Sequence, residues 1–101
     1  LRHFPKNVEI RHLLGYSCLT LGNPPQSLIH FEEAMKLNPE DSGGWWGLAL
    51  VHAELGRPDQ AASCLEECLR LDPKTAQEMI QKERDNPDSS LKACLVRHFS
   101  H

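Results

Sequence analysis

Apolar residues in the first part of the chain recur every three or four positions, in two runs separated by a short break. The first run is Ile10, Leu13, Leu14, Cys18 and Leu21, and the second is Leu28, Phe31, Ala34, Met35 and Leu37. This spacing places side chains on one face of an α-helix, so each run predicts an amphipathic helix. Residues 22–25 (Gly-Asn-Pro-Pro) predict the turn between them, because glycine favours the position after a helix and proline favours the first turn of the next.

The same plan follows in the next part of the chain. Its first run is Trp45, Leu48, Ala49, His52 and Leu55, and its second is Ala61, Ala62, Leu65, Cys68, Leu69 and Leu71. Residues 56–59 predict the turn, and Pro39 and Pro73 end the second helices because proline cannot continue the helical hydrogen bonds. Asp41 or Ser42 is expected to cap the third helix.

The two helix pairs are copies of one unit at an offset of 34 residues. The matching positions are Pro5, Pro39 and Pro73; Gly22 and Gly56; Pro24 and Pro58; and residues 31–39 with 65–73. A fixed period of this length is the signature of a helical repeat. The pattern resembles the tetratricopeptide repeat over about residues 1–75, with matches at Leu14, Gly15, Ala34 and Pro39 in one unit and Trp45, Leu48, Ala61 and Pro73 in the next. It departs from that family at Arg11, Cys18, Ser27, His52 and Cys68.

This resemblance implies an all-α fold, a right-handed α-solenoid of antiparallel helix pairs. The expected organisation is residues 1–5 as the end of a preceding repeat, 6–39 and 40–73 as two repeats, and 74–101 as a capping helix and a final segment. Because the sequence starts at Leu1 rather than methionine, we expect a fragment of a longer chain whose first helix pair exposes an apolar end face.

The pattern weakens after Pro73. Residues 75–84 predict a polar capping helix, residues 85–88 a break, and a last helix would carry Leu91, Cys94, Leu95 and Phe99. Two interpretations stay open, a degenerate third repeat cut short or a packed terminal helix. The sequence favours the first, although no glycine marks the turn.

The resemblance also implies that the first helix of each repeat lines a groove that binds a peptide or helix of another protein. The candidate binding residues are Glu9, His12, Tyr16 and Thr20; Trp46, Leu50 and Glu54; and Gln77, Gln81 and Arg84. Some members of the family bind the terminal carboxylate of chaperones with lysine, arginine and asparagine. The corresponding positions here are His12, Tyr16, Gly47, Gln77 and Gln81, so no such binding is expected.

Trp46 is the most informative of these residues. Its neighbour Trp45 takes the family's core position, so Trp46 is expected to be exposed beside Tyr16 as an anchor for a partner. The alternative is that Trp46 packs in the core. Gly43, Gly44 and Gly47 surround it, and they either open space for a ligand or let helices approach closely.

Charge and composition narrow the function further. The net charge is -3, which does not favour nucleic-acid binding. No apolar run is long enough to span a membrane, and we expect no signal peptide. The four cysteines suggest reduced thiols, so we expect an intracellular protein, cytoplasmic or nuclear. The glutamate pairs 32–33 and 66–67 are expected on the outer face, as solvated surface or as a docking site for a basic partner.

Neither a metal site nor an active site is predicted. Cys64 and Cys68 are four residues apart, but Cys68 takes a core position and the six histidines are scattered. His12, Tyr16 and Glu54 could share the groove, yet no oxyanion donor or phosphate-binding loop accompanies them. We therefore expect no cofactor and no enzyme activity in this segment.

Three functions remain. The favoured one is an interaction scaffold. The second is a structural module that stacks on further repeats or associates with another copy through its exposed ends. The third is an adaptor joined to an enzyme in the same polypeptide. Whether Trp46 is exposed or buried is expected to distinguish the first two.

Overall fold

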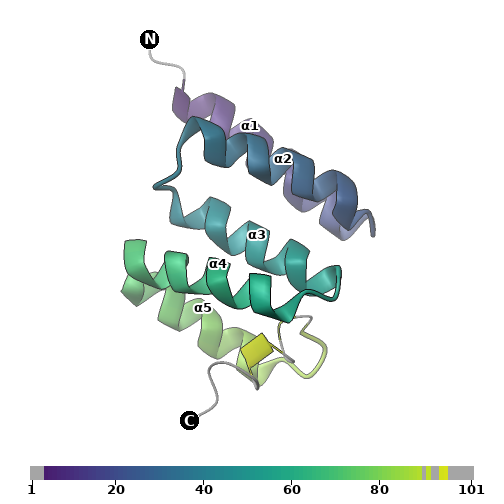
Figure 1. The fold of residues 1–101 in the computed structure, drawn as a ribbon, viewed down its shortest axis with the longest axis vertical. Coiled ribbons are helices and arrows are strands. Elements are labelled where there is room, and N and C mark those ends of the chain that lie inside the picture. The colour runs from purple at the N-terminus through teal and green to yellow at the C-terminus, as the bar shows by residue number, and fades with distance from the viewer. Residues whose placement is uncertain (1–3, 90, 92–93, 96–101) are drawn as a thin grey trace.

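The computed structural model describes residues 4–89, 91 and 94–95. In this part of the chain, the regular structure consists of five long α-helices: α1 (Phe4–Thr20), α2 (Pro24–Leu37), α3 (Ser42–Glu54), α4 (Pro58–Leu71) and α5 (Pro73–Asp85). They stack in chain order along the longest dimension of the molecule, so that the two termini lie at opposite ends (Figure 1). The molecule measures 45 × 28 × 19 Å. The predicted all-α helical solenoid is confirmed.

Both predicted glycine turns are present and have the same geometry. Gly22 and Gly56 have φ angles of 79° and 76°, in the left-handed region that glycine tolerates best. At the end of α1, the amide of Asn23 donates to the carbonyl of Cys18 at 2.8 Å and the amide of Gly22 donates to Leu19 at 3.0 Å. This is the Schellman arrangement, which satisfies carbonyls left unpaired at the end of the helix. The same two bonds recur 34 residues later.

The helix starts also follow the sequence. Asp41 caps α3, because its Oδ1 accepts a hydrogen bond from the amide of Gly43 at 3.0 Å. Asp72 caps α5 in a similar way, with a distance of 3.4 Å to the amide of Thr75. Proline occupies the first turns of α2, α4 and α5, where its missing N–H costs no hydrogen bond.

The ring of Phe31 is the centre of the contact between the two helix pairs. It is fully buried and makes an edge-to-face contact with Tyr16, with ring centroids 4.9 Å apart. Gly15 of α1 and Gly47 of α3 both lie so close to this ring that neither position has room for a Cβ atom. Ser27, at a position where the family has alanine, is buried and donates a hydrogen bond to the carbonyl of Gly15 at 2.6 Å.

The apolar stripe of the first helix lies at the surface. The first helix forms, but Ile10, Leu13, Leu14 and Leu21 are exposed by 49%, 68%, 42% and 83%. Among the described residues no helix covers this side of α1, and the helix packs inward instead through Gly15, Tyr16 and Leu19. The exposed stripe corresponds to the apolar end face that the sequence analysis expected of the first helix pair.

The segment after Pro73 follows the prediction as far as the structure describes it. α5 is a polar helix that ends at Asp85, and a turn at Pro87 and Asp88 follows it. Leu91, Cys94 and Leu95 are buried against the core, while Phe99 lies outside the described residues. The choice between a degenerate third repeat and a terminal helix stays open.

The proposed repeat boundaries also stay predictions. Residues 1–3 lie outside the described part, whereas Phe4 and Pro5 begin α1. Of the glutamate pairs, Glu32 and Glu66 are exposed. Their neighbours make ion pairs, Glu33 with Arg11 at 3.3 Å and Glu67 with Arg70 at 2.8 Å.

Candidate functional site

The structure brings four of the predicted binding residues together in one shallow depression. It has a volume of about 260 Å³ and is lined by Tyr16, Leu19, Thr20, Leu50 and Glu54. α1 supplies the first three of these residues and α3 the other two. The two leucines contribute apolar surface to this lining, and Thr20 and the carboxylate of Glu54 contribute polar groups. Leu19 was not among the predicted residues, although its position one helical turn after Tyr16 places it on the same side of α1.

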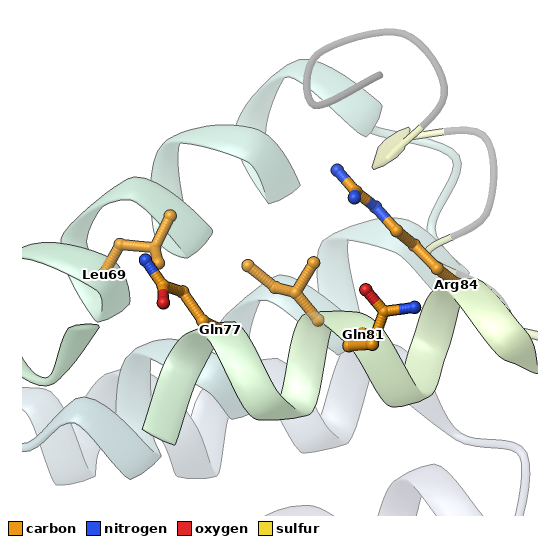
Figure 2. A pocket seen from close by; sticks show the side chains of 5 residues that line it. Leu69, Gln77, Gln81 and Arg84 are labelled. Atoms are coloured by element: carbon orange, nitrogen blue, oxygen red, sulfur yellow. The ribbon is translucent and has the colours of Figure 1, made fainter. Parts of the chain in front are cut away.

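A second depression holds the three predicted residues of α5. It has a volume of about 280 Å³, and its lining consists of Leu69, Gln77, Ile80, Gln81 and Arg84. Figure 2 shows Leu69 of α4 at one end and Gln77, Gln81 and Arg84 along α5. The Gln81 side chain donates to Asp85 at 3.2 Å. Leu69 was not predicted to lie here, since its run indicated a core position, and Ile80 was not among the candidate binding residues.

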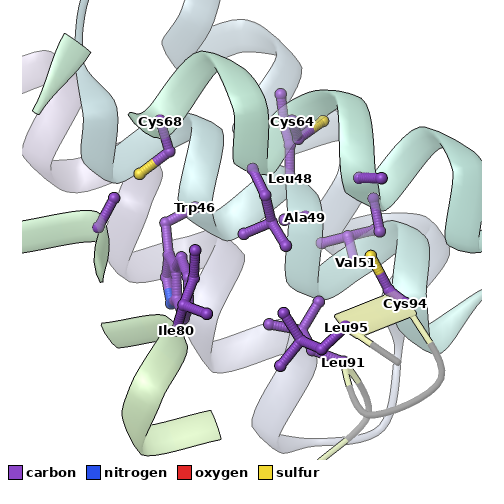
Figure 3. Close-up of a cluster of buried hydrophobic side chains, with 14 of the residues drawn as sticks. Trp46, Leu48, Ala49, Val51, Cys64, Cys68, Ile80, Leu91, Cys94 and Leu95 are labelled. Atoms are coloured by element: carbon purple, nitrogen blue, oxygen red, sulfur yellow. The ribbon is translucent and has the colours of Figure 1, made fainter. Parts of the chain in front are cut away.

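Trp46 is in neither depression, and the prediction that it is exposed is wrong. Its exposed fraction is 6%, and it belongs to the central apolar cluster together with Ile80. Figure 3 shows its indole pointing toward Ile80 of α5. Trp45 is only partly buried, and its Nε1 donates to the carbonyl of Pro39 at 2.8 Å. The cluster that buries Trp46 thus includes a side chain of α5.

The glycines around Trp46 serve helix packing. A Cβ atom at Gly44 would overlap the sulfur of Met35, and one at Gly47 would overlap the ring of Phe31. Gly43 is less crowded, because the nearest atom to a Cβ there is Asp41 Oδ1 at 3.3 Å. Of the two alternatives left by the sequence, close approach of helices is therefore the one observed at Gly44 and Gly47.

The remaining two candidates lie away from the depressions. Glu9 is exposed on α1. His12 is partly buried, and its Nε2 lies 3.4 Å from Asp41 Oδ2, an ion-pair distance without hydrogen-bond geometry. His12 also packs near Phe31, with ring centroids 5.9 Å apart. His12 therefore lies at the junction of α1 and α3, and little of its surface is available to a partner.

Tyr16, which lines the first depression, is held in its neutral form. Burial, with smaller effects from Cys68 and Asp41, raises the pKa of Tyr16 to about 12, so its hydroxyl stays protonated. That hydroxyl lies 3.4 Å from the carbonyl of Gly43, to which it donates. A protonated tyrosine is a neutral hydrogen-bonding group here, with no basic oxygen for proton abstraction.

The thiols of Cys64, Cys68 and Cys94 have the same neutral character. Burial raises the pKa of Cys64 to about 11 and also raises those of Cys68 and Cys94. Nucleophilic cysteines need the opposite, a lowered pKa that favours the thiolate. Within the described residues, no group of three or more His, Cys, Asp or Glu side chains is arranged to hold a metal ion.

Comparison with known proteins identifies the repeat. The tetratricopeptide repeat model matches residues 8–41 and again residues 42–75. The chain belongs to the tetratricopeptide repeat family. These windows have the 34-residue period of the sequence pattern and begin two residues later than the predicted repeats 6–39 and 40–73.

Each of the relatives found among known proteins is similar to only part of this chain. It is 34% identical over 58 residues to the peroxisomal targeting signal 1 receptor of Dictyostelium discoideum, a match that covers 57% of the chain and 9% of the receptor. It is 35% identical over 65 residues to the peroxisomal targeting signal receptor of Saccharomyces cerevisiae, covering 61% and 11%. It is 31% identical over 70 residues to the Hsp70-Hsp90 organizing protein 2 of Arabidopsis thaliana, covering 61% and 12%.

The chain thus spans about a tenth of the length of these relatives. Two consecutive repeats of this family indicate a protein-interaction module. In the part of the chain that is described, no helix is long and apolar enough to cross a membrane.

Proposed function

We propose that this chain holds a peptide or helical segment of a partner protein on the face built by the first helices of its repeats. The observation that carries the proposal is the depression between α1 and α3, where five residues from two helices meet. The apolar side chains of Leu19 and Leu50 suit an apolar side chain of the partner, which would be removed from water there. Glu54 in the same lining favours a basic group next to that side chain.

Trp46 has a supporting part in this proposal. Because it is buried in the central apolar cluster, it stabilises the packing of the helices and does not itself contact a partner. The anchor positions are therefore Tyr16 and Leu50, which correspond to each other at the 34-residue offset. Glu9, Gln77, Gln81 and Arg84 are proposed as outer contacts of a longer segment, because they are exposed on the same set of helices.

The relatives support the class of function. Two of these relatives are named as receptors of a peroxisomal targeting signal, and the third is named for organizing Hsp70 and Hsp90. We propose that this chain does not bind a terminal carboxylate as chaperone-binding members do. The corresponding positions, His12, Tyr16, Gly47, Gln77 and Gln81, carry no lysine or arginine, and Gly47 is covered by Phe31. The four free cysteines support an intracellular place for this interaction.

Site-specific photo-cross-linking tests the depression. A photoreactive phenylalanine analogue replaces Thr20, which lines the depression, and in a matched control it replaces the exposed Glu66 of α4. The expected result is a partner cross-linked from Thr20 but not from Glu66, and lost when Leu50 is changed to Glu. Circular dichroism checks that the variants fold. Equal cross-linking at both positions, or persistence in Leu50→Glu, would contradict the proposal.

A second candidate is a structural module that stacks on other helices and has no ligand in the depression. The observation that favours it is the exposed apolar side of α1. Sedimentation velocity over a range of concentrations tests it in its simplest form, self-association through this side. A dimer that the substitution Leu13→Glu dissociates would support it.

A further inference from the structure

The side chain of Ser89 connects the end of α5 to the last residues of the core. Its hydroxyl donates a hydrogen bond to Glu83 Oε1 and accepts one from the amide of Leu91 at 3.1 Å. The single donor of the hydroxyl and one of its acceptor positions are therefore in use. Because Glu83 lies in the last turn of α5, this hydroxyl fixes the backbone at Leu91 to that helix.

Three core residues follow this connection. Leu91, Cys94 and Leu95 are exposed by 0%, 1% and 2%, and all three belong to the central apolar cluster. Figure 3 shows them at one edge of that cluster. Leu91 is two residues after Ser89 and bonded to its hydroxyl. A displacement of Ser89 therefore pulls on the first of the three buried side chains.

Ser89 differs from the other serine and threonine residues that the structure describes, because it lies outside the helices and follows an exposed turn. The hydrogen bonds of this turn are local. The amide of Asp88 donates to Asn86 Oδ1 at 3.0 Å, and the amide of Ser89 donates to the carbonyl of Asn86 at 3.2 Å. Such a turn opens without the unfolding of a helix, so an enzyme can reach this hydroxyl. The hydroxyl residues within helices are Ser17, Thr20, Ser27, Ser42, Ser63 and Thr75.

We propose that Ser89 is a phosphorylation site, and that a phosphate there releases Leu91, Cys94 and Leu95 from the core. A protein kinase with ATP supplies the group. The Ser89 Oγ forms a bond to the γ-phosphorus while the bond from that phosphorus to the bridging oxygen of ADP breaks. The hydroxyl proton passes to a base of the kinase, and ADP leaves.

Charge is the physical reason for the release. Phosphoserine carries a charge of about −1.5 to −2 at pH 7 and has lost the hydroxyl proton, so it repels the carboxylate of Glu83 to which the serine donated. Asp85 and Asp88, which lie between the two residues in the sequence, are acidic as well. The basic neighbours Lys82 and Arg84 point about 100° to either side of Glu83 round the helix. The carboxylate is thus the charge that faces the phosphate.

The test uses the whole chain with phosphoserine incorporated at position 89 during synthesis. Alkylation by iodoacetamide is followed at each cysteine by mass spectrometry. Cys94 reports the release, and Cys68, which is 2% exposed with its Sγ 3.5 Å from the carbonyl of Ser42, reports unfolding of the repeats. We expect Cys94 to be alkylated at least about tenfold faster than in the unmodified chain, with the rate at Cys68 unchanged.

Two further proteins separate charge from loss of the hydroxyl. Glu83→Gln in the phosphoserine chain removes the repelling carboxylate and offers an amide donor, so it is expected to slow alkylation of Cys94 at least about tenfold. Ser89→Ala removes the hydroxyl without adding charge, and its effect is expected to be smaller than that of phosphoserine. Phosphoserine at Ser63, which is exposed on α4, is the matched control and should leave Cys94 protected.

A rate at Cys94 that phosphoserine 89 leaves unchanged or lowers, as binding of the phosphate by Arg84 would do, overturns the proposal. Equal rates in Ser89→Ala and the phosphoserine chain, or no slowing by Glu83→Gln, also overturn it. A parallel increase at Cys68 would show general unfolding and has the same consequence. Incubation of the chain with ATP and a cell extract should place phosphate on Ser89, and its absence there contradicts the proposal. Neither Glu83 nor Ser89 lines a depression, so these outcomes are independent of partner binding.

Discussion

Gly47 of α3 lies directly against the ring of Phe31 of α2, and this contact sets the distance between the two helix pairs. Gly15 lies against the same ring from α1, so the ring is enclosed by two helices at positions without side chains. Phe31 is fully buried and cannot move toward solvent. Both glycines are therefore required by packing, although each lies inside a helix, where glycine is unfavourable.

Gly47→Ala is expected to destabilise the protein. The added methyl group overlaps Phe31, and overpacking of this kind costs about 1–3 kcal/mol, whereas the better helix propensity of alanine returns at most about 1 kcal/mol. Urea denaturation should therefore show a lower free energy of unfolding. Gly43→Ala is the matched control, because its surroundings are looser, and it should be neutral or slightly stabilising. A stabilised Gly47→Ala variant would show that the two pairs do not pack as described.

The two tryptophans should report different environments. In the variant Trp45→Phe only the buried Trp46 remains, so its emission is expected at shorter wavelength and with weak quenching by iodide. In Trp46→Phe only the partly buried Trp45 remains, and quenching should be stronger. Trp46→Ala is expected to lose about 3–5 kcal/mol of stability, the usual cost of removing a large buried aromatic side chain. Equal quenching of the two variants would place Trp46 at the surface.

His52 should make the protein less stable in mild acid. Burial lowers its pKa below 6.5, and Arg57 lowers it further, while Glu32 opposes the shift. As the pH falls below 6.5 the unfolded chain takes up the proton first, so stability decreases until the lower pKa of the folded state is reached. Above pH 6.5 both states are neutral and this contribution is fully present. In His52→Gln, urea denaturation at pH 7.5 and pH 5 should show a smaller difference than in the parent protein.

Tyr16 can be titrated without interference, because it is the single tyrosine in the sequence. Its pKa is raised to about 12 in the folded protein. The absorbance of tyrosinate near 295 nm should therefore appear at a pH about two units higher in the folded protein than in urea. The sign follows from linkage. The unfolded chain loses this proton near pH 10, so stability decreases as the pH rises from 10 toward 12. A midpoint near 10 in the folded protein would mean that the hydroxyl is solvated.

The four thiols should react in two groups with Ellman's reagent at pH 8. Cys18 is only partly buried, whereas Cys64, Cys68 and Cys94 are buried and have raised pKa values. Cys18 is therefore expected to react first, and the other three only as the protein opens. Cys18→Ser should remove the fast phase. A fast phase that survives in this variant would show that one of the three buried thiols is accessible.

The sequence by itself determined the helices, their turns and their repetition. Gly22 and Gly56, the cap at Asp41 and the prolines act on the backbone within one or two turns of their own position, so their effect does not depend on distant parts of the chain. The 34-residue offset then identified the repeated unit, and with it the family and the general class of function. The sequence also placed Tyr16, Thr20, Leu50 and Glu54 on helices whose sides meet.

Only the tertiary structure decided which apolar sides are covered. The pattern of Ile10, Leu13 and Leu14 is as strong as that of Leu48 and its neighbours, yet the first set is exposed and the second is buried. Trp46 was expected at the surface, but it is buried in one cluster with Ile80 of a helix about thirty residues later. Periodicity fixes the direction of a side chain from its own helix, whereas burial depends on which other helix arrives opposite it, and that is settled only when the pairs stack.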